Sequence, residues 1–394
     1  MAATDEKRVK DTVVLLGAGA SHSTLIAGAV AAMYEKNFPF DMIYTSGGGC
    51  LIGLLLATHP RRTGGPKKAL RALVEQMGVH DVIYSMVPIG YKTFFKPGPF
   101  TRLFHTWAQN FKIREFPSGP PDNRQRDALR DDMSRLVNAG KGSYRRFYND
   151  WIDMWASIMT PTTLNPFSQG VCAPFPFLEE MVDFDELKRF PGRFYMNAYN
   201  ITKDITKGKM VQFSKEEITP AHFRAALAYP SIYPPAEING QLYYEGADHD
   251  PINFGPLMEE CRKCERDMEN IKIKNIVLID ILDNLESYLI REPQSLWDAY
   301  GISIMMPVVA LAEKCIEHFE QHQNIEQDAH GCLVYENGKP KKKYNFLRMK
   351  FDIPEEVQPH IMEWSYSNLD SLWREGYKTG KDFCDRHFPP HPPH

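Results

Sequence analysis

The sequence predicts an α/β protein built on a central, mostly parallel sheet. The run TVVLL at residues 12–16 is β-branched and apolar, as expected of a strand buried on both faces. A glycine-rich loop, an alanine-rich helix and a second apolar strand at 41–45 follow it. Strand, helix and strand over residues 12–45 form a βαβ unit, in which the two strands run parallel. A further buried strand is expected at 275–281.

Size and composition favour one large domain. The 394 residues are 43% hydrophobic, enough for a sizeable core. A net charge of −4 and a pI near 6.4 give no reason to expect a nucleic-acid partner. Seven cysteines without regular spacing favour a reducing compartment. The polar N-terminus lacks the apolar core of a signal peptide, and no unbroken apolar run is long enough for a membrane span. We therefore expect a soluble, cytoplasmic protein.

The loop GAGAS at residues 17–21 is a candidate anion site. It begins at Gly17 and presents the N–H groups of Gly19, Ala20 and Ser21 at the start of the next helix. Such a helix N-terminus binds a phosphate or a developing oxyanion. A dinucleotide fingerprint is the alternative, but the third glycine is missing and no acid ends the second strand.

Ser46 ends that second strand instead. The order strand, small residues, apolar helix in DMIYTSGGGCLIGLLLA is the arrangement of a nucleophile elbow, which lifts a serine hydroxyl out of a sharp turn. Gly48 stands two residues after Ser46, as the pattern requires, whereas Tyr44 stands two before it in place of glycine. Gly47 and Gly48 join the candidate anion-binding residues. A plain glycine-rich turn is the alternative.

Together these segments resemble the patatin-like phospholipases. In that family a strand leads into a glycine-rich oxyanion loop, a helix with an Ala-Gly pair and a strand entering G-T-S-x-G. Here the order is LLGAGASHS, IAGAVAAMYEKNF and FDMIYTSGGGCLIGLLLA. The family's three oxyanion glycines fall on Ala18, Gly19 and Ala20, and its usual arginine falls on His22, so the loop departs from the pattern.

A second block extends the resemblance. Residues 192–213 read as a β-hairpin, and 241–245 as a strand. Between them lies the family's sequence of helix and proline-rich turn, here AALAYPSIYPP. The strand ends in Glu245-Gly246-Ala247 where the family has Asp-Gly-Gly. The two blocks cover roughly residues 12–57 and 192–260 in the family's order.

The resemblance implies a serine hydrolase of lipid or other acyl esters that uses a Ser-Asp dyad and no cofactor. Ser46 is the expected nucleophile, and Glu245 inherits the place of the acid although it is one methylene longer. Asp248 is the alternative base. Asp248 and Asp250 also suit turn residues that hydrogen-bond to their own backbone. No cluster of residues suggests a metal site.

Two other functions stay open. The substitutions at Tyr44 and Glu245 also fit a patatin-like protein that binds lipid or a partner without turnover. An α/β-hydrolase with a Ser-Asp-His triad would need a late histidine beside Ser46, for which His249 and His318 are candidates.

We expect a single patatin-like domain, 1–394, with a core at about 12–57 and 192–285. A helical and aromatic insertion at about 60–190 serves as a cap or lid, and a helical and hairpin extension covers about 290–394. The candidate acyl-binding wall of the insertion consists of Phe94, Phe95, Phe100, Trp107, Trp151 and Trp155. In the extension, a hairpin around Asn337-Gly338 carries the basic cluster Lys339–Lys343, a candidate for peripheral contact with a membrane.

Overall fold

The fold is described from a computed structural model of the chain. The structure describes residues 10–19, 22–58, 65–88, 90, 92, 146–148, 150–151, 154–155, 181–202, 207–259, 271–281, 296–328, 330, 332–351 and 363–389.

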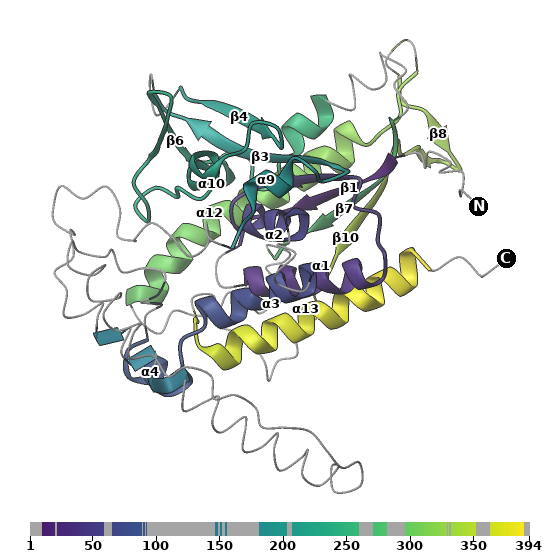
Figure 1. Ribbon diagram of the computed structural model, residues 1–394. Coiled ribbons are helices and arrows are strands. Elements are labelled where there is room, and N and C mark those ends of the chain that lie inside the picture. The colour runs from purple at the N-terminus through teal and green to yellow at the C-terminus, as the bar shows by residue number, and fades with distance from the viewer. Residues whose placement is uncertain are drawn as a thin grey trace, which may run out of the picture.

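In the described part of the chain the main sheet has eight strands and is mostly parallel, as predicted (Figure 1). Its order is β10-β7-β1-β2-β3-β6-β5, and β4 also pairs with β3. The strand pair β1 and β2 is parallel, which confirms the predicted βαβ unit. The strands are β1 Lys10–Leu16, β2 Met42–Thr45, β3 Arg193–Asn200, β4 Lys209–Ser214, β5 Ala236–Ile238, β6 Gln241–Glu245, β7 Ile271–Ile279 and β10 Asn345–Met349.

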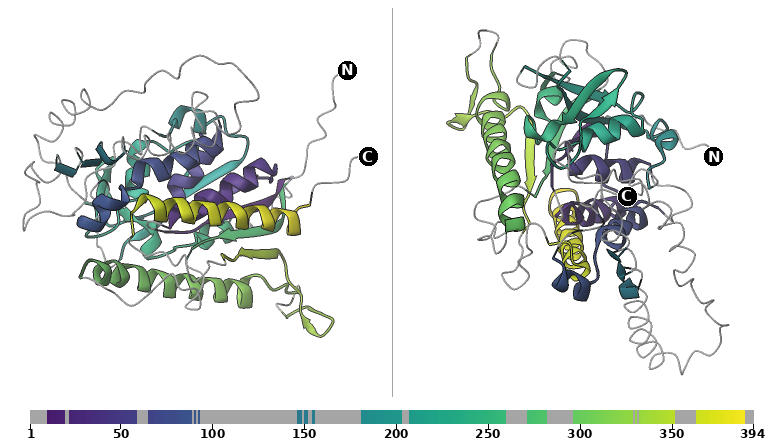
Figure 2. Two further views of the ribbon diagram at one scale, coloured as in Figure 1. Left: turned by 90° about the horizontal axis from the view of Figure 1, so that it is seen from below. Right: turned by 90° about the vertical axis from the view of Figure 1, so that its left-hand side faces the viewer.

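Helices cover both faces of the sheet. The helix α12 lies on one face, and α1, α2, α3 and α13 lie on the other (Figure 2). The core lies between these layers, and the apolar side chains of β1 from Val13 to Leu16 are completely buried in it. The helices are α1 Ser23–Glu35, α2 Gly48–Ala57, α3 Pro66–Met77, α4 Asp81–Met86, α9 Phe184–Leu187, α10 Pro220–Ala226, α12 Leu296–His318 and α13 Tyr366–His387.

Strand β3 is the element that organises the candidate site. One edge of β3 pairs with β4 along Tyr195–Asn200. Since a strand has only two edges, β2 and β6 must share the other. There β2 runs parallel along 193–196, and β6 runs antiparallel along 198–200. The carboxyl ends of β2 and β6 therefore meet head to head, opposite Asn197.

The helices α1 and α13 pack with their backbones almost touching. A β-carbon on Gly376 would stand 1.9 Å from the carbonyl oxygen of Leu25, and one on Gly380 would stand 2.4 Å from that of Ala29. In the same way, Gly28 of α1 faces the carbonyl oxygen of Trp373 in α13. Glycine is needed here because any side chain would force the two helices apart.

The C-terminal region contributes to the sheet and to both helical layers. The turn at Asn337-Gly338 joins β8 Tyr335–Glu336 to β9 Lys339–Pro340, which confirms that hairpin. The segment after it was expected to belong to the hairpin, but β10 pairs in parallel with β7 in the main sheet. Thus β10 and α13, both placed in an extension by the sequence, belong to the fold itself.

The helix α12 contains Pro307 and is helical on both sides of it. With the π-helical turn η3 Phe319–Gln323, the segment Ala299–Gln323 is long and apolar enough to cross a membrane, a length that sequence inspection did not anticipate. Val308, Ala312 and Ile316 are buried, but only 33% of its 18-residue apolar window is buried, and Met306 is 53% exposed.

Of the insertion, residues 65–88 form α3 and α4, and beyond them only short pieces fall within the described residues. Phe94, Phe95, Phe100 and Trp107 lie outside them. The ring of Trp151 lies 5.9 Å from the rings of Phe147 and Trp155, and Trp155 is 42% exposed. The predicted acyl-binding wall therefore stays a prediction.

Candidate active site

Ser46 occupies the turn from β2 into α2. Its N–H donates to the carbonyl oxygen of Leu16 at 3.0 Å, which continues the ladder between β1 and β2 past the end of the strand. Gly47 then turns the chain with φ +51°, and α2 begins at Gly48. The serine side chain is completely buried, and its hydroxyl donates to the backbone carbonyl oxygen of Asp250 at 2.9 Å. This is the strand, sharp turn and helix that the sequence predicted.

Glu245 ends β6 and lies against the same turn. A β-carbon on Gly47 would stand 2.3 Å from Oε1 of Glu245, so the carboxyl group covers the α-carbon next to Ser46. Glu245 is only 8% exposed. Two residues almost 200 positions apart are brought together because β2 and β6 end at the same point of β3.

The surroundings of the Glu245 carboxyl group shift its pKa. Burial, with the nearby charge of Asp248 as a second cause, raises the pKa of Glu245 well above its usual value. Burial also raises the pKa of Asp248, although hydrogen bonding from the Tyr229 hydroxyl opposes that shift. A carboxyl group with a raised pKa is suited to proton transfer near neutral pH.

Asp248 and Asp250 follow in the turn η2 Gly246–Asp248 and just beyond it. The carboxylate of Asp250 accepts the N–H groups of Asn253, Phe254 and Gly255 at 2.7, 3.2 and 3.1 Å. Asp250 is therefore a turn residue whose side chain bonds to nearby backbone, as one interpretation of the sequence suggested. Its backbone carbonyl oxygen faces Ser46.

The two histidines considered for a triad have other neighbours. The ring of His249 stacks on Tyr199 with centroids 3.6 Å apart, and burial lowers its pKa. His318 is exposed at the end of α12, where its ring lies 5.0 Å from that of His322. For Ser46, the hydrogen-bond acceptor found among the described residues is a carbonyl oxygen and not an imidazole.

Two glycine-rich turns meet beside Ser46. A β-carbon on Gly48 would stand 2.3 Å from the carbonyl oxygen of Gly19, so the loop after β1 lies directly on the start of α2. Within the described residues, the N–H groups of Gly19, Gly47 and Gly48 have no hydrogen-bond acceptor. They stay candidate oxyanion donors. Gly17 is not available as an oxyanion donor, because its N–H donates to the carbonyl oxygen of Ile279 at 3.1 Å. Ala20 and Ser21 lie outside the described residues.

Two buried asparagines were missed by the sequence analysis. Asn197 donates from Nδ2 to the carbonyl oxygen of Asp250 at 2.9 Å. Asn253 donates from Nδ2 to the carbonyl oxygen of Thr45, the residue before Ser46, at 3.0 Å. Neither side chain is exposed to solvent. The signal for Asn197 was present, since it is an amide in the middle of the strand segment FYMNAY.

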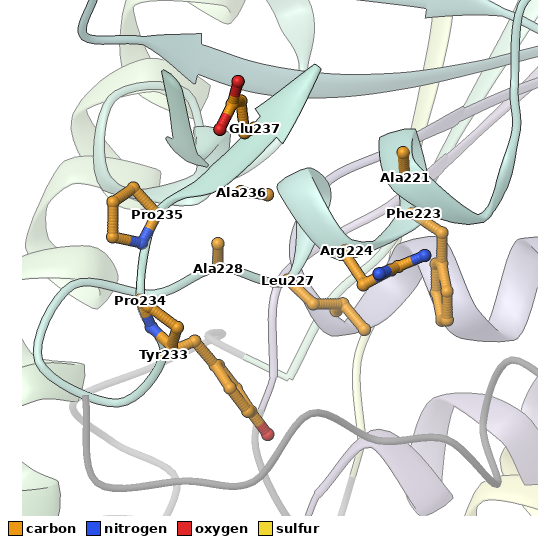
Figure 3. A pocket seen from close by; sticks show the side chains of 10 residues that line it. All are labelled: Ala221, Phe223, Arg224, Leu227, Ala228, Tyr233, Pro234, Pro235, Ala236 and Glu237. Atoms are coloured by element: carbon orange, nitrogen blue, oxygen red, sulfur yellow. The ribbon is translucent and has the colours of Figure 1, made fainter. Parts of the chain in front are cut away.

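A cavity of about 370 Å³ lies between α10 and β5 (Figure 3). The backbone carbonyl of Ala228, in its wall, accepts the N–H of Glu245 at 2.9 Å. Its lining, mainly apolar, comprises Ala221, Phe223, Arg224, Leu227, Ala228, Tyr233, Pro234, Pro235, Ala236 and Glu237. No group of three metal-ligating side chains occurs within the described ranges.

The sequence model of the patatin-like phospholipase family matches residues 13–258. A search of curated proteins found no significant match. Among solved structures, VipD from Legionella pneumophila aligns with 14% identity and a TM-score of 0.34, covering 96% of this chain and 67% of VipD. Human GIVD cytosolic phospholipase A2 aligns with 8% identity and a TM-score of 0.35, covering 95% of this chain and 58% of that protein.

Proposed function

The chain belongs to the patatin-like phospholipase family, and from that membership we propose that it is a serine acyl hydrolase that cleaves carboxylic esters of lipids. Ser46 is the nucleophile, and Glu245 is the base. The observation that carries the proposal is the contact of the Glu245 carboxyl group with Gly47, the residue next to the serine. Asp248, three residues further on, is the alternative base.

The reaction follows from these positions. Ser46 Oγ attacks the ester carbonyl carbon and passes its proton to Glu245, for which the hydroxyl turns away from the carbonyl of Asp250. The N–H groups of Gly19 and Ala20 hold the tetrahedral oxyanion. The leaving alcohol takes the proton from Glu245, and an acyl group remains on Ser46. Water then attacks that acyl group with Glu245 as base, and Glu245 passes the proton to Ser46 Oγ as the acyl–Oγ bond breaks and the carboxylic acid leaves.

The substrate class is supported by the family and by the cavity between α10 and β5. Its volume of about 370 Å³ lies in the range of small-molecule sites, and its mainly apolar lining suits part of an acyl chain. Ala228 in the cavity wall accepts the backbone N–H of Glu245, although neither Ser46 nor Glu245 itself lines the cavity.

Labelling with a fluorophosphonate, which reacts covalently with activated serines, tests the proposal. The wild-type protein should be labelled, and Ser46→Ala should not. Ser85→Ala is a matched control, because Ser85 is exposed on α4 and bonds only to the carbonyl of Val82; it should be labelled like wild type. No labelling of wild type, or undiminished labelling of Ser46→Ala, would show that Ser46 is not a catalytic nucleophile.

A second function, lipid or partner binding without turnover, is favoured by one specific observation. The Ser46 hydroxyl is fully buried and donates to a peptide carbonyl, which does not activate it as a base would. Binding of phospholipid vesicles together with an absence of fluorophosphonate labelling would support this function in place of hydrolysis.

A further inference from the structure

Asn197 lies at the point where the two halves of the candidate site meet. Its neighbours in β3 are Met196, paired with Thr45 of β2, and Ala198, paired with Glu245 of β6. Along β3, β2 leads into Ser46 just before Asn197, and β6 ends at Glu245 just after it. The side chain of Asn197 is not exposed to solvent.

The amide of Asn197 contacts both ends of the turn that follows Glu245. At the start, a β-carbon on Gly246 would stand 2.6 Å from its Cγ and 2.7 Å from its Oδ1. At the far end, its Nδ2 donates to the carbonyl oxygen of Asp250 at 2.9 Å. The glycine of the family's acid-Gly step is thus required because the Asn197 side chain fills the space beside it.

The carbonyl oxygen of Asp250 links this contact to the nucleophile. It accepts Asn197 Nδ2 and Ser46 Oγ, each at 2.9 Å, and a carbonyl oxygen has two lone pairs for two such donors. The Asn197 amide therefore fixes the acceptor that orients the serine hydroxyl.

Packing alone does not explain why residue 197 carries an amide oxygen. Asn197 Oδ1 is buried and has no hydrogen-bond partner among the described residues. Leaving a buried acceptor unpaired is destabilising, and an apolar residue of the same shape would avoid that loss. An amide at this position is therefore explained better by the donor bond to Asp250 than by stability.

From these contacts we infer that Asn197 is a positioning residue for the proposed hydrolase, which sets the placement of Ser46 relative to Glu245. The inference rests on the proposed function, since it assigns a role within that reaction. It acts through the Asp250 carbonyl and the Gly246 turn and does not require Asn197 to touch the substrate. Misplacement of reacting groups by about 1 Å can cost a hundredfold in rate.

The test is the rate and the final extent of fluorophosphonate labelling in Asn197→Leu. The variant keeps the shape and loses the amide, so the labelling rate should fall about tenfold to a hundredfold while the folded protein is still labelled to completion. With a nitrophenyl ester, kcat should fall and KM should stay unchanged. Asn200→Leu is the matched control, because Asn200 lies on the same strand and its amide bonds to Gln241, away from Ser46; its rate should equal that of wild type.

Other outcomes of this experiment would contradict either the inference about Asn197 or the proposed function. Labelling of Asn197→Leu at the wild-type rate would overturn the inference and leave the proposed function standing. A lower extent with an unchanged rate would also overturn it, since it would show a purely structural role. No labelling of wild type would overturn the proposed function itself. If Asn197→Leu does not fold, Asn197→Asp replaces it, because the aspartate keeps the size and removes the Nδ2 donor; the same slower rate is expected.

Discussion

The carboxyl group of Glu245 lies against the α-carbon of Gly47, where a β-carbon would stand 2.3 Å from Oε1. Gly47 directly follows Ser46, so this contact puts a buried acid beside the proposed nucleophile. It exists because β2 and β6 end head to head on one edge of β3. The predictions below test the consequences of that arrangement.

The first prediction concerns which carboxylate is the base. Glu245→Gln keeps the shape and removes the base, so ester hydrolysis should fall at least about a hundredfold with folding intact. Asp248→Asn should change the rate little when it is measured well above the midpoint of the pH profile. Glu216→Gln is the control, because Glu216 is exposed after β4 and lies outside both the site and the cavity. If the effects of the Glu245 and Asp248 variants were exchanged, Asp248 would be the base.

The second prediction concerns pH. Glu245 accepts a proton only when ionised, and burial raises its pKa well above the usual value, so hydrolysis should increase with pH through that raised pKa. The charge of Asp248 is the second cause of the shift. Asp248→Asn removes this charge, and the acidic limb of kcat against pH should move to lower pH. A limb that stays in place or moves upward would contradict the assignment of Glu245 as base.

The third prediction concerns stability. The pKa of Glu245 is higher in the folded protein than its ordinary value of 4.5 in the unfolded chain. Between these two values the unfolded chain binds fewer protons, so the free energy of unfolding falls as pH rises. Glu245→Gln removes this loss, which amounts to about 1.4 kcal/mol per pH unit in that window. In denaturant unfolding, the free energy of unfolding of Glu245→Gln should rise relative to that of wild type as pH rises above 4.5. A difference that does not change with pH would contradict the raised pKa of Glu245.

The fourth prediction is that Gly47→Ala abolishes labelling. Alanine at φ +51° and ψ −129° is strained by about 1–3 kcal/mol, and its β-carbon would displace the Glu245 carboxyl group. Gly240→Ala separates the two effects, because Gly240 has φ +74° but nothing within 4 Å of an added β-carbon. We expect Gly240→Ala to be strained and still labelled. Normal labelling of Gly47→Ala would mean that the position of Glu245 against this turn does not matter.

The fifth prediction concerns the packing of α13 on α1. Gly376→Ala would place a β-carbon 1.9 Å from the carbonyl oxygen of Leu25, which is rigid backbone, so the two helices must separate. Such overpacking typically costs about 1–3 kcal/mol. Thermal unfolding should show a lower Tm for Gly376→Ala, and Lys378→Ala, on the exposed side of the same helix, should stay close to wild type. Equal Tm values would show that the interface adapts.

The sequence by itself determined the parts of this protein that depend on local pattern. Apolar β-branched runs gave β1, β2 and β7, and the turn from β2 into α2 could be predicted because its small residues permit a backbone conformation that others resist. The family followed from the order of such segments. Ser46 and Glu245 could be singled out as candidates for the same reason, since each stands at the end of a recognisable strand.

The tertiary structure alone decided how those ends are joined. No local pattern tells that β2 and β6 share one edge of β3, because strand pairing depends on contacts between residues far apart in the chain. That pairing is what makes Asn197 a central residue and sets the Ser46 hydroxyl on the carbonyl of Asp250. Likewise, Gly28 could be recognised as a place of close approach, but its partner, α13, could not, because nearly 350 residues separate Gly28 from Trp373 and only the packed core brings their backbones together.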